Sequence, residues 1–407
     1  MEKKKKPAIR FKGFTDSWEQ RKLGELGEIM TGSTPSTSKS EYYSEDGIPW
    51  VTPTDINSQT ISDTPRKLSG EGIKVGRVVP ANTILCTCIA SIGKNTLLTV
   101  KGSFNQQINC LTPNEYNDAY FLLTESEIWS NIMKRMAAAG TMQIVNKTEF
   151  SELTTMVPKL EEQKKIGQYF HTIGHLITLH QRKYDKLQII KKAMLEKMFP
   201  QNGSCFPEIR FKGFTDSWEQ RKFDKWGDFY YGHSCPKWSV TEDATIPCIR
   251  YGELYTKFGA KIDKVYSYTN MPTEKLRFSK GTEVLIPRVG EDPMDYNHCT
   301  WLSLKDVAIG EMISVFNTDQ DPLFSATMFN ATLQKEFAIR VEGGSVTNLY
   351  FDKLRNIDIS YPLLAEQKKI AAFFENLDHL ITLHQRMQKN SKQYIITMKS
   401  ILNNIKY

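Results

Sequence analysis

The sequence predicts an α+β protein built as two similar halves, each with a globular domain followed by a long helix. Three observations predict this fold class: an internal repeat, two long stretches with coiled-coil spacing, and short β-type runs between them. The length of 407 residues is too great for one compact core and suits two or three domains. We therefore expect a chain with approximate twofold internal symmetry.

The repeat begins in a short constant segment. Residues 9–22 (IRFKGFTDSWEQRK) recur without change at residues 209–222. Two further pairs of segments match about 200 residues apart: 162–166 with 366–370, and 175–182 with 379–386. An identity of this length does not arise by chance, so the chain contains a duplication.

The repeat divides the chain into six segments. They are a constant segment (1–22), a first variable domain (23–158), a central long helix (159–200), the second constant segment (201–222), a second variable domain (223–362) and a C-terminal long helix (363–407). Each variable domain is long enough to have its own core.

The variable domains predict mostly short strands. Residues 84–90, 107–111, 283–286 and 337–341 are short apolar runs bounded by Gly, Pro or Asn. Residues 120–136 predict one helix inside the first domain. Both domains are therefore expected to be α+β.

The two long helices carry apolar residues at alternating spacings of four and three, typical of the a and d positions of a coiled coil. The predicted seam is Ile166, Phe170, Ile173, Ile177, His180, Tyr184, Leu187 and Met194 in the first helix, and Ile370, Phe374, Leu377, Ile381, His384, Ile395, Met398, Leu402 and Ile405 in the second. Since the chain repeats one seam, we expect the helices to pack on each other; docking of each helix on a separate domain is the alternative. The two histidines are expected to fix register and not to bind metal.

Composition and charge exclude several classes of protein. No apolar run approaches the roughly 20 residues that span a bilayer, the N-terminus lacks the apolar part of a secretory signal, and the seven cysteines show no CxxC spacing. We therefore expect a cytoplasmic protein with reduced thiols. The net charge of +7 is concentrated in the constant segments and long helices, while each variable domain carries −4. Nucleic-acid binding thus requires cationic side chains gathered on one face.

No catalytic motif is present, so we expect a protein that is not an enzyme. Residues 93–95 do not form a phosphate loop, because Cys88 stands where the first Gly is needed and Asn95 where Ser or Thr is needed. The chain contains no Pro-Pro dipeptide, which an adenine methyltransferase motif requires, and no Gly-x-Ser-x-Gly.

The order of constant segment, variable domain and helix opening with Glu-Gln-Lys-Lys-Ile, all repeated, resembles the specificity subunit of type I restriction-modification enzymes. Ser17-Trp18-Glu19-Gln20 and its copy at 217–220 carry the resemblance, with echoes at 31–35, 48–51, 104–109 and 140–143. It covers essentially the whole chain. The second domain departs from it: residues 231–236 replace Thr-Gly-Ser-Thr-Pro, and nothing there matches Phe-Asn-Gln-Gln-Ile-Asn.

The resemblance implies two target recognition domains that each read one half of a split site in double-stranded DNA, and an antiparallel coiled coil that spaces them. It also implies that methyltransferase subunits and restriction/translocase subunits dock on this chain. The two matching helix starts suggest two methyltransferase subunits. No cofactor is expected in this chain; S-adenosylmethionine, ATP and Mg²⁺ are expected in the partners. Because the two domains differ in sequence, we expect an asymmetric, interrupted DNA site.

Residues for DNA contact are those that hydrogen-bond bases or phosphates: Arg or Lys to guanine, Asn or Gln to adenine, Ser or Thr to phosphate. The candidates in the first domain are Ser33, Thr34, Ser36, Lys39, Lys94, Asn105, Gln106 and Gln143. Those in the second are His233, Lys237, Arg250, Tyr251, Arg288 and Thr347. A protein–protein coiled-coil scaffold without sequence-specific DNA binding is the alternative function, supported by the acidic totals of the two domains.

Overall fold

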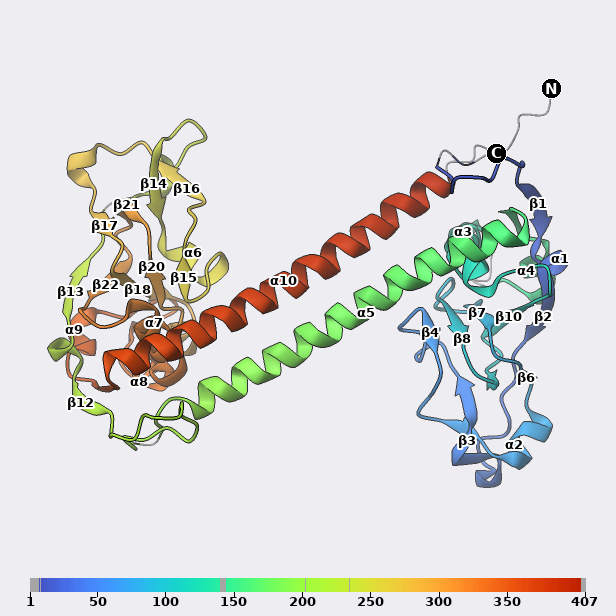
Figure 1. The fold of residues 1–407 in the computed structure, drawn as a ribbon, viewed down its shortest axis with the longest axis horizontal. Helices are drawn as coiled ribbons and strands as arrows, with labels where there is room; N and C mark the ends of the chain where they lie inside the picture. The colour runs from blue at the N-terminus through green and yellow to red at the C-terminus, as the bar shows by residue number, and fades with distance from the viewer. Residues whose placement is uncertain (1–6, 8, 140–143, 202, 234, 404–407) are drawn as a thin grey trace. The chain divides into compact units, whose positions relative to one another are not determined.

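The computed structural model describes residues 7, 9–139, 144–201, 203–233 and 235–403, with only the backbone of residues 139 and 400–403 (Figure 1). The chain divides into two compact units, unit 1 (residues 1–182 and 385–407) and unit 2 (residues 183–384). The helices α5 (Leu160–Lys197) and α10 (Leu364–Asn403) each contribute to both units. No helix of the described residues is long and apolar enough to cross a membrane.

Unit 1 contains a five-stranded sheet of order β2-β10-β7-β8-β4, a four-stranded sheet of order β5-β3-β9-β6, and the pair β1-β11. Its elements besides the long helices are β1 (Glu19–Lys22), α1 (Leu23–Leu26), β2 (Gly27–Thr31), β3 (Tyr43–Val51), β4 (Thr60–Ile61), β5 (Lys67–Leu68), α2 (Gly70–Val75), β6 (Val78–Val79), β7 (Thr83–Thr87), β8 (Asn95–Leu98), β9 (Gly102–Phe104), β10 (Ile108–Pro113), α3 (Ala119–Ala139), α4 (Lys147–Glu152) and β11 (Thr154–Val157). The core of this unit contains Trp129 and Phe121 of α3 and Phe170 near the start of α5.

Unit 2 has a five-stranded sheet of order β13-β22-β18-β20-β15, a four-stranded sheet of order β16-β14-β21-β17, the pair β12-β25 and a small sheet β19-β24-β23. Its elements are β12 (Glu219–Lys222), β13 (Asp228–Tyr231), β14 (Ile246–Ile249), α6 (Tyr251–Thr256), β15 (Lys261–Ile262), β16 (Ser267–Thr269), β17 (Phe278–Lys280), β18 (Glu283–Pro287), β19 (Val289–Gly290), β20 (Thr300–Leu302), β21 (Lys305–Ile309), β22 (Ile313–Asn317), α7 (Pro322–Thr332), α8 (Gln334–Ala338), β23 (Glu342–Gly343), β24 (Thr347–Asn348), α9 (Phe351–Leu354) and β25 (Asp358–Tyr361). Its core is built around Phe223, Phe316, Phe324 and Phe329.

The two units share one topology although their sequences differ. Their five- and four-stranded sheets match strand for strand, including the parallel pairs β4-β8 and β15-β20, and β3-β9 and β14-β21. The duplication therefore extends through both variable domains, where the sequence alone showed it only at their borders.

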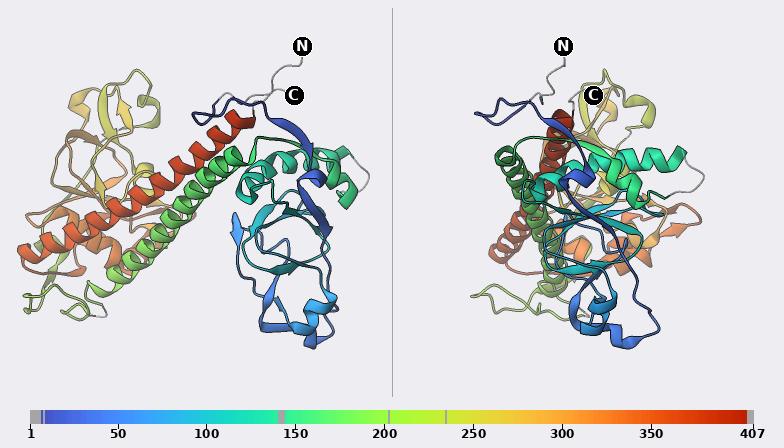
Figure 2. Two further views of the ribbon diagram at one scale, coloured as in Figure 1. Left: turned by 45° about the vertical axis from the view of Figure 1, so that its right-hand side comes forward. Right: turned by 90° about the vertical axis from the view of Figure 1, so that its right-hand side faces the viewer.

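The predicted α+β class and the antiparallel coiled coil are confirmed. In each unit the helices α5 and α10 lie side by side and run in opposite directions (Figures 1 and 2). In unit 1 the hydroxyl groups of Tyr169 and Tyr394 are 2.5 Å apart and the Gln388 amide donates to Gln181; in unit 2 Lys191 pairs with Asp378 at 2.5 Å.

The predicted seam positions are the covered ones. Six of them, Ile166, Phe170, Ile370, Phe374, Leu377 and Ile381, are at most 7% exposed, and Ile395 is also buried. The positions Ile173, Ile177, His180, Tyr184, Leu187, Met194, His384 and Met398 are half-buried. The side chains of Leu402 and Ile405 lie outside the described residues.

One strand prediction is wrong. Residues 337–341 were expected to be a strand, but Phe337 lies on α8, and residues 339–341 form no strand. Leu333 and Phe337 are both buried, and their spacing of four places them on one helix face, while Arg340 donates to the Glu336 carbonyl group. A short apolar run does not distinguish strand from helix. The helices α6 and α7 were not predicted, whereas the helix expected at 120–136 is α3 and the runs 84–90, 107–111 and 283–286 overlap β7, β10 and β18.

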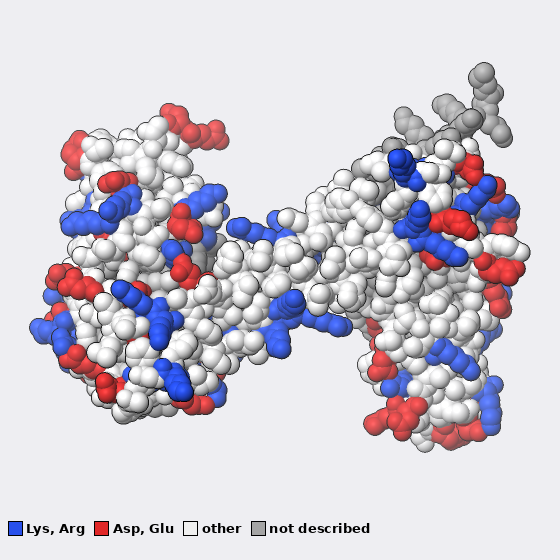
Figure 3. Space-filling view, in the orientation of Figure 1, with Lys and Arg blue, Asp and Glu red and all other residues white. Residues whose placement is uncertain are grey.

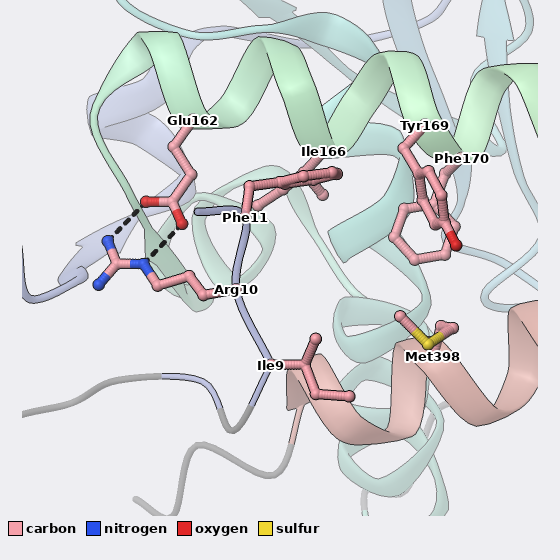
Figure 4. Close-up of a pocket in the computed structure, with 8 residues that line it drawn as sticks. All are labelled: Ile9, Arg10, Phe11, Glu162, Ile166, Tyr169, Phe170 and Met398. Carbon is pink, nitrogen blue, oxygen red and sulfur yellow. Dashed lines mark hydrogen bonds and ion pairs between the residues drawn. The ribbon is translucent and has the colours of Figure 1, made fainter. Parts of the chain in front are cut away.

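The constant segments are held to the starts of the long helices by the same buried contacts in both units. In unit 1 Arg10 donates two hydrogen bonds, of 2.7 and 2.6 Å, to Glu162 of α5, whose side chain is 1% exposed (Figure 4). In unit 2 Arg210 donates two of 2.7 Å to Glu366. Figure 4 also shows Phe11 beside Tyr169 and Phe170, with Met398 of α10 opposite them.

The glutamine that follows this glutamate in each long helix holds the beginning of a second helix in place. The Gln163 side chain donates to the Pro158 carbonyl group at 2.9 Å and accepts from the backbone N–H of Asp118 at 2.9 Å, directly before α3. Gln367 does the same with Pro362 and Asp321, directly before α7. The Glu-Gln pair of the repeat is thus a buried polar junction, which accounts for its identity in both halves.

Candidate nucleic-acid interface

The turn after β2 is built by a glycine that the backbone requires. The Gly32 N–H donates to the carbonyl group of Ile108 at 3.0 Å, and a Cβ atom at Gly32 would lie 2.1 Å from the carbonyl oxygen of Asn105. Gly232 has the same contacts in unit 2: its N–H donates to Ile313 at 3.1 Å, and a Cβ would lie 2.1 Å from the Gly310 oxygen. The two loops thus share one backbone path.

An arginine side chain donates a hydrogen bond to the backbone of each of these turns. Arg77 donates from Nη1 to the Thr31 carbonyl group, and Arg277 donates from Nη1 to the Tyr231 carbonyl group at 2.7 Å. These two arginines were not predicted as site residues. The signal that would have found them is their separation of 200 residues, which equals the separation of the constant segments.

Three of the predicted residues of unit 1 come together at this turn. The Ser33 hydroxyl accepts from the backbone N–H of Arg77 at 2.9 Å, and the exposed Thr34 hydroxyl donates to the amide oxygen of exposed Gln106. Polar side chains from the β2–β3 and β9–β10 connections therefore form one patch, which offers the amide N–H₂ of Gln106 and the hydroxyl group of Ser33 to an acceptor.

The other predicted residues of unit 1 lie apart from this patch or have structural contacts. Exposed Ser36 contacts Ser38 at 2.8 Å, and Lys39 contacts the Tyr42 hydroxyl at 3.3 Å. Exposed Lys94 donates to the Pro53 carbonyl group at 3.3 Å. Asn105 is 7% exposed and exchanges hydrogen bonds with Gln107, so its amide stabilises the loop. Gln143 lies outside the described residues.

In unit 2 the predicted residues have unequal access to solvent. His233 and Lys237 are exposed on the loop after β13, and Tyr251 begins α6 with 37% of its surface exposed. Arg250 precedes α6 and is half-buried. Thr347 is 6% exposed, and its hydroxyl contacts Tyr296 and the Gly290 carbonyl group, which leaves it a structural role.

Arg288 is the predicted residue with the most distinctive surroundings. It follows β18, and its guanidinium carbon lies 4.8 Å from the ring centre of Tyr231 and 5.9 Å from that of Tyr350. Burial raises the pKa of Tyr231, and the positive charge of Arg288 partly offsets this. The ring of Tyr231 is therefore neutral and stacks on a cation.

Charges on the visible surface are mixed. Figure 3 shows Lys and Arg interspersed with Asp and Glu over the sheet-containing parts of both units, whereas the middle of the long helices shows only Lys and Arg on this face. Among the described residues, no group of three or more His, Cys, Asp or Glu is placed to hold a metal ion. The site features therefore consist of hydrogen-bonding and aromatic side chains on loops.

Comparison with known proteins identifies the same parts of the chain. The family model described as the type I restriction modification DNA specificity domain matches residues 15–188 and 306–392. The type I restriction enzyme MjaIX specificity subunit of Methanocaldococcus jannaschii is 23% identical, over 94% of this chain and 90% of its own length. The HindI specificity subunit of Haemophilus influenzae is 31% identical over 38% of this chain and 35% of its own.

A solved structure has the same fold. The S subunit of a type I restriction-modification system from M. genitalium superposes with a TM-score of 0.63 at 12% sequence identity, covering 97% of this chain and 98% of that one. The fold of this chain is therefore shared with a protein of little sequence similarity.

Proposed function

The chain belongs to the family of type I restriction-modification DNA specificity subunits, and on this premise we propose that it reads an asymmetric, two-part DNA sequence, one part with each unit. The proposal makes unit 1 and unit 2 two recognition domains with separate preferences.

The observation that carries this proposal is a shared backbone with different side chains at matching positions. Ser33 and His233 both follow the turn glycine and donate their backbone N–H groups to the matching strands, to Phe104 and Ile309. One position thus presents a hydroxyl group in unit 1 and an imidazole in unit 2. Identical domains would demand a palindrome, whereas two unlike readers suit unlike half-sites.

We further propose that α5 and α10 set the spacing between the two half-sites and dock the partner subunits. At about 1.5 Å per residue each helix is roughly 60 Å long, which suits two readers about one turn of DNA apart or more. The identical constant segments at the starts of the two helices support two equivalent docking sites for methyltransferase subunits. Methylation and cleavage, with S-adenosylmethionine, ATP and Mg²⁺, are assigned to the methyltransferase and restriction/translocase subunits, and this chain supplies sequence recognition.

The experiment that tests the proposal is a genome-wide map of modified adenines in cells with and without this chain. A two-part sequence that is modified only when the chain is present is the expected result. Inserting one helical turn into both α5 and α10 should lengthen the spacer and leave both half-sequences unchanged. Changed half-sequences at unchanged spacing would contradict the assignment of the helices.

A scaffold that binds only proteins predicts a different outcome. Binding of the assembled complex to duplex DNA would then show no sequence preference, and modification would not depend on sequence. A sequence reader gives both a sequence preference and a steep decline of affinity with salt, because contacts to phosphates release counterions.

A further inference from the structure

Arg288 has no oxygen acceptor among the described residues. Its Nη2 donates to the sulfur of Met312 at 3.1 Å, a weak acceptor, and its Nε is buried without a hydrogen-bond partner. A buried donor left without an acceptor is unfavourable, and a folded protein has few of them. The guanidinium is instead held by the two rings of Tyr231 and Tyr350.

Five other arginines of unit 2 have conventional oxygen partners. Those that donate to a carboxylate or a carbonyl oxygen are Arg210, Arg221, Arg277, Arg340 and Arg355. These contacts explain their positions through the fold. Arg288 has no such contact, and the rings of Tyr231 and Tyr350 beside it leave Nη1 without a partner among the described residues.

The matching position in unit 1 carries a different side chain on the same backbone. The backbone N–H groups of Cys88 and Arg288 donate to Gln107 and Met312, which take the same place in the two units. Their carbonyl groups accept from Val145 and Leu349, respectively. The Cys88 thiol donates to the Gln107 carbonyl group and is 2% exposed. The fold therefore permits, but does not require, an arginine at this position.

A guanidinium has five N–H donors, of which the Nε donor is buried and one Nη2 donor is used by Met312. Three donors remain: two on Nη1, which donates to none of the described residues, and one on Nη2. One donor from each of these two nitrogens matches the adjacent O6 and N7 acceptors of guanine in the major groove. A phosphate contact carries no sequence information and gives no reason for the plane of the guanidinium to be fixed or for the position to differ between the units.

We propose that Arg288 is a specificity-determining residue that donates two hydrogen bonds to one guanine in the half-site read by unit 2. This inference rests on the proposed function and adds the base and the residue. Tyr231 and Tyr350 act as positioning residues, since they hold the guanidinium flat and lower the entropy lost on binding.

The test is selection of binding sites from duplexes with both half-sites randomised, using the complex of this chain with its methyltransferase subunits. Arg288→Met retains a long side chain between the two rings but has no donors. We expect it to lose the preference for guanine at one position, with affinity for the original site reduced about 10- to 100-fold. The half-site read by unit 1 should be unchanged.

Two further variants and the wild type make the outcomes distinct. Arg340→Ala removes a positive charge that is paired with Glu336 and should leave every base preference unchanged. Tyr350→Leu should keep the preference for guanine but reduce affinity several-fold.

Unchanged base preferences in Arg288→Met and Arg288→Ala, both shown by thermal unfolding to be folded, would overturn the inference. An equal loss of affinity for all sequences would also overturn it, because that loss denotes a phosphate contact. A wild-type complex without sequence preference would instead refute the proposed function.

Discussion

A buried carboxyl group in unit 1 gives the sharpest test of the packing. Glu125 on α3 is 2% exposed and accepts one hydrogen bond, at 3.0 Å, from the Thr155 hydroxyl of β11. Unit 2 has Met328 and Ile359 at the matching positions: Met328 follows Asp321 by seven residues as Glu125 follows Asp118, and both aspartates cap their helices. We predict that Glu125→Met with Thr155→Ile, copying unit 2, stabilises the chain.

The size of the expected gain in stability follows from the pKa of Glu125. Burial raises the pKa of Glu125 from its ordinary 4.5 to about 7, although the hydrogen bond from Thr155 and the charge of Lys399 act in the opposite direction. Because the folded pKa is the higher one, the folded chain binds more protons between these values, and wild-type stability falls as the pH rises through this window. The resulting cost is about 1 kcal/mol at pH 5 and about 3 kcal/mol at pH 8, at 1.36 kcal/mol for each pKa unit.

The assay is urea-induced unfolding of the wild type and the double variant at pH 5 and pH 8. The gain of the variant in the free energy of unfolding should be larger by about 2 kcal/mol at pH 8. Glu115→Gln, which changes an exposed carboxyl group, should show no such difference. Met328→Glu should have the opposite effect on unit 2, with a loss that grows between the two pH values. An equal gain at both would refute the argument, because it would mean that the Glu125 carboxyl group titrates normally in the folded chain.

Two further predictions follow from the buried contacts. Arg10→Met should lower the free energy of unfolding by about 3–5 kcal/mol, because it leaves the Glu162 carboxylate buried without its partner. Arg21→Met, in an exposed ion pair, should leave the free energy of unfolding nearly unchanged in the same urea titration. Gly32→Ala should disrupt the turn after β2 and reduce DNA affinity of the complex, because its Cβ would overlap a carbonyl oxygen, whereas Gly70→Ala, with nothing within 4 Å, should bind as the wild type does in the same titration.

The sequence was sufficient to predict the repeat, the two long helices and their seam, because duplication and a spacing of four and three are local patterns. It was insufficient for residues 337–341, where five apolar and charged residues fit a strand and a helix equally well. The side chain of Phe337 is buried in one core with residues of α7, the neighbouring helix, which the sequence did not predict either.

The candidate site was predictable in composition but not in geometry. Arg288 was predicted from its position between Pro287 and Gly290, yet the flanking rings of Tyr231 and Tyr350 come from segments about 60 residues away on either side. Conversely, Asn105 and Thr347 were predicted as contacts because of their residue types, and both are buried in hydrogen bonds to the protein. Residue type indicates what a side chain can bind, whereas burial decides whether it is available.

The constant segments contain more identity than the fold requires. Buried contacts account for Arg10 and Trp18 and for their copies at 210 and 218. Lys12, Thr15 and Ser17 are exposed, as are their copies, and exposed positions away from special contacts tolerate substitution with little effect on stability. The variable domains between them have diverged in sequence while keeping every strand of both sheets, so the fold alone does not preserve identity at exposed positions. Two identical exposed surfaces at the starts of two matching helices are what two copies of one partner would bind, and this supports the proposal of two methyltransferase docking sites on a chain whose two readers differ.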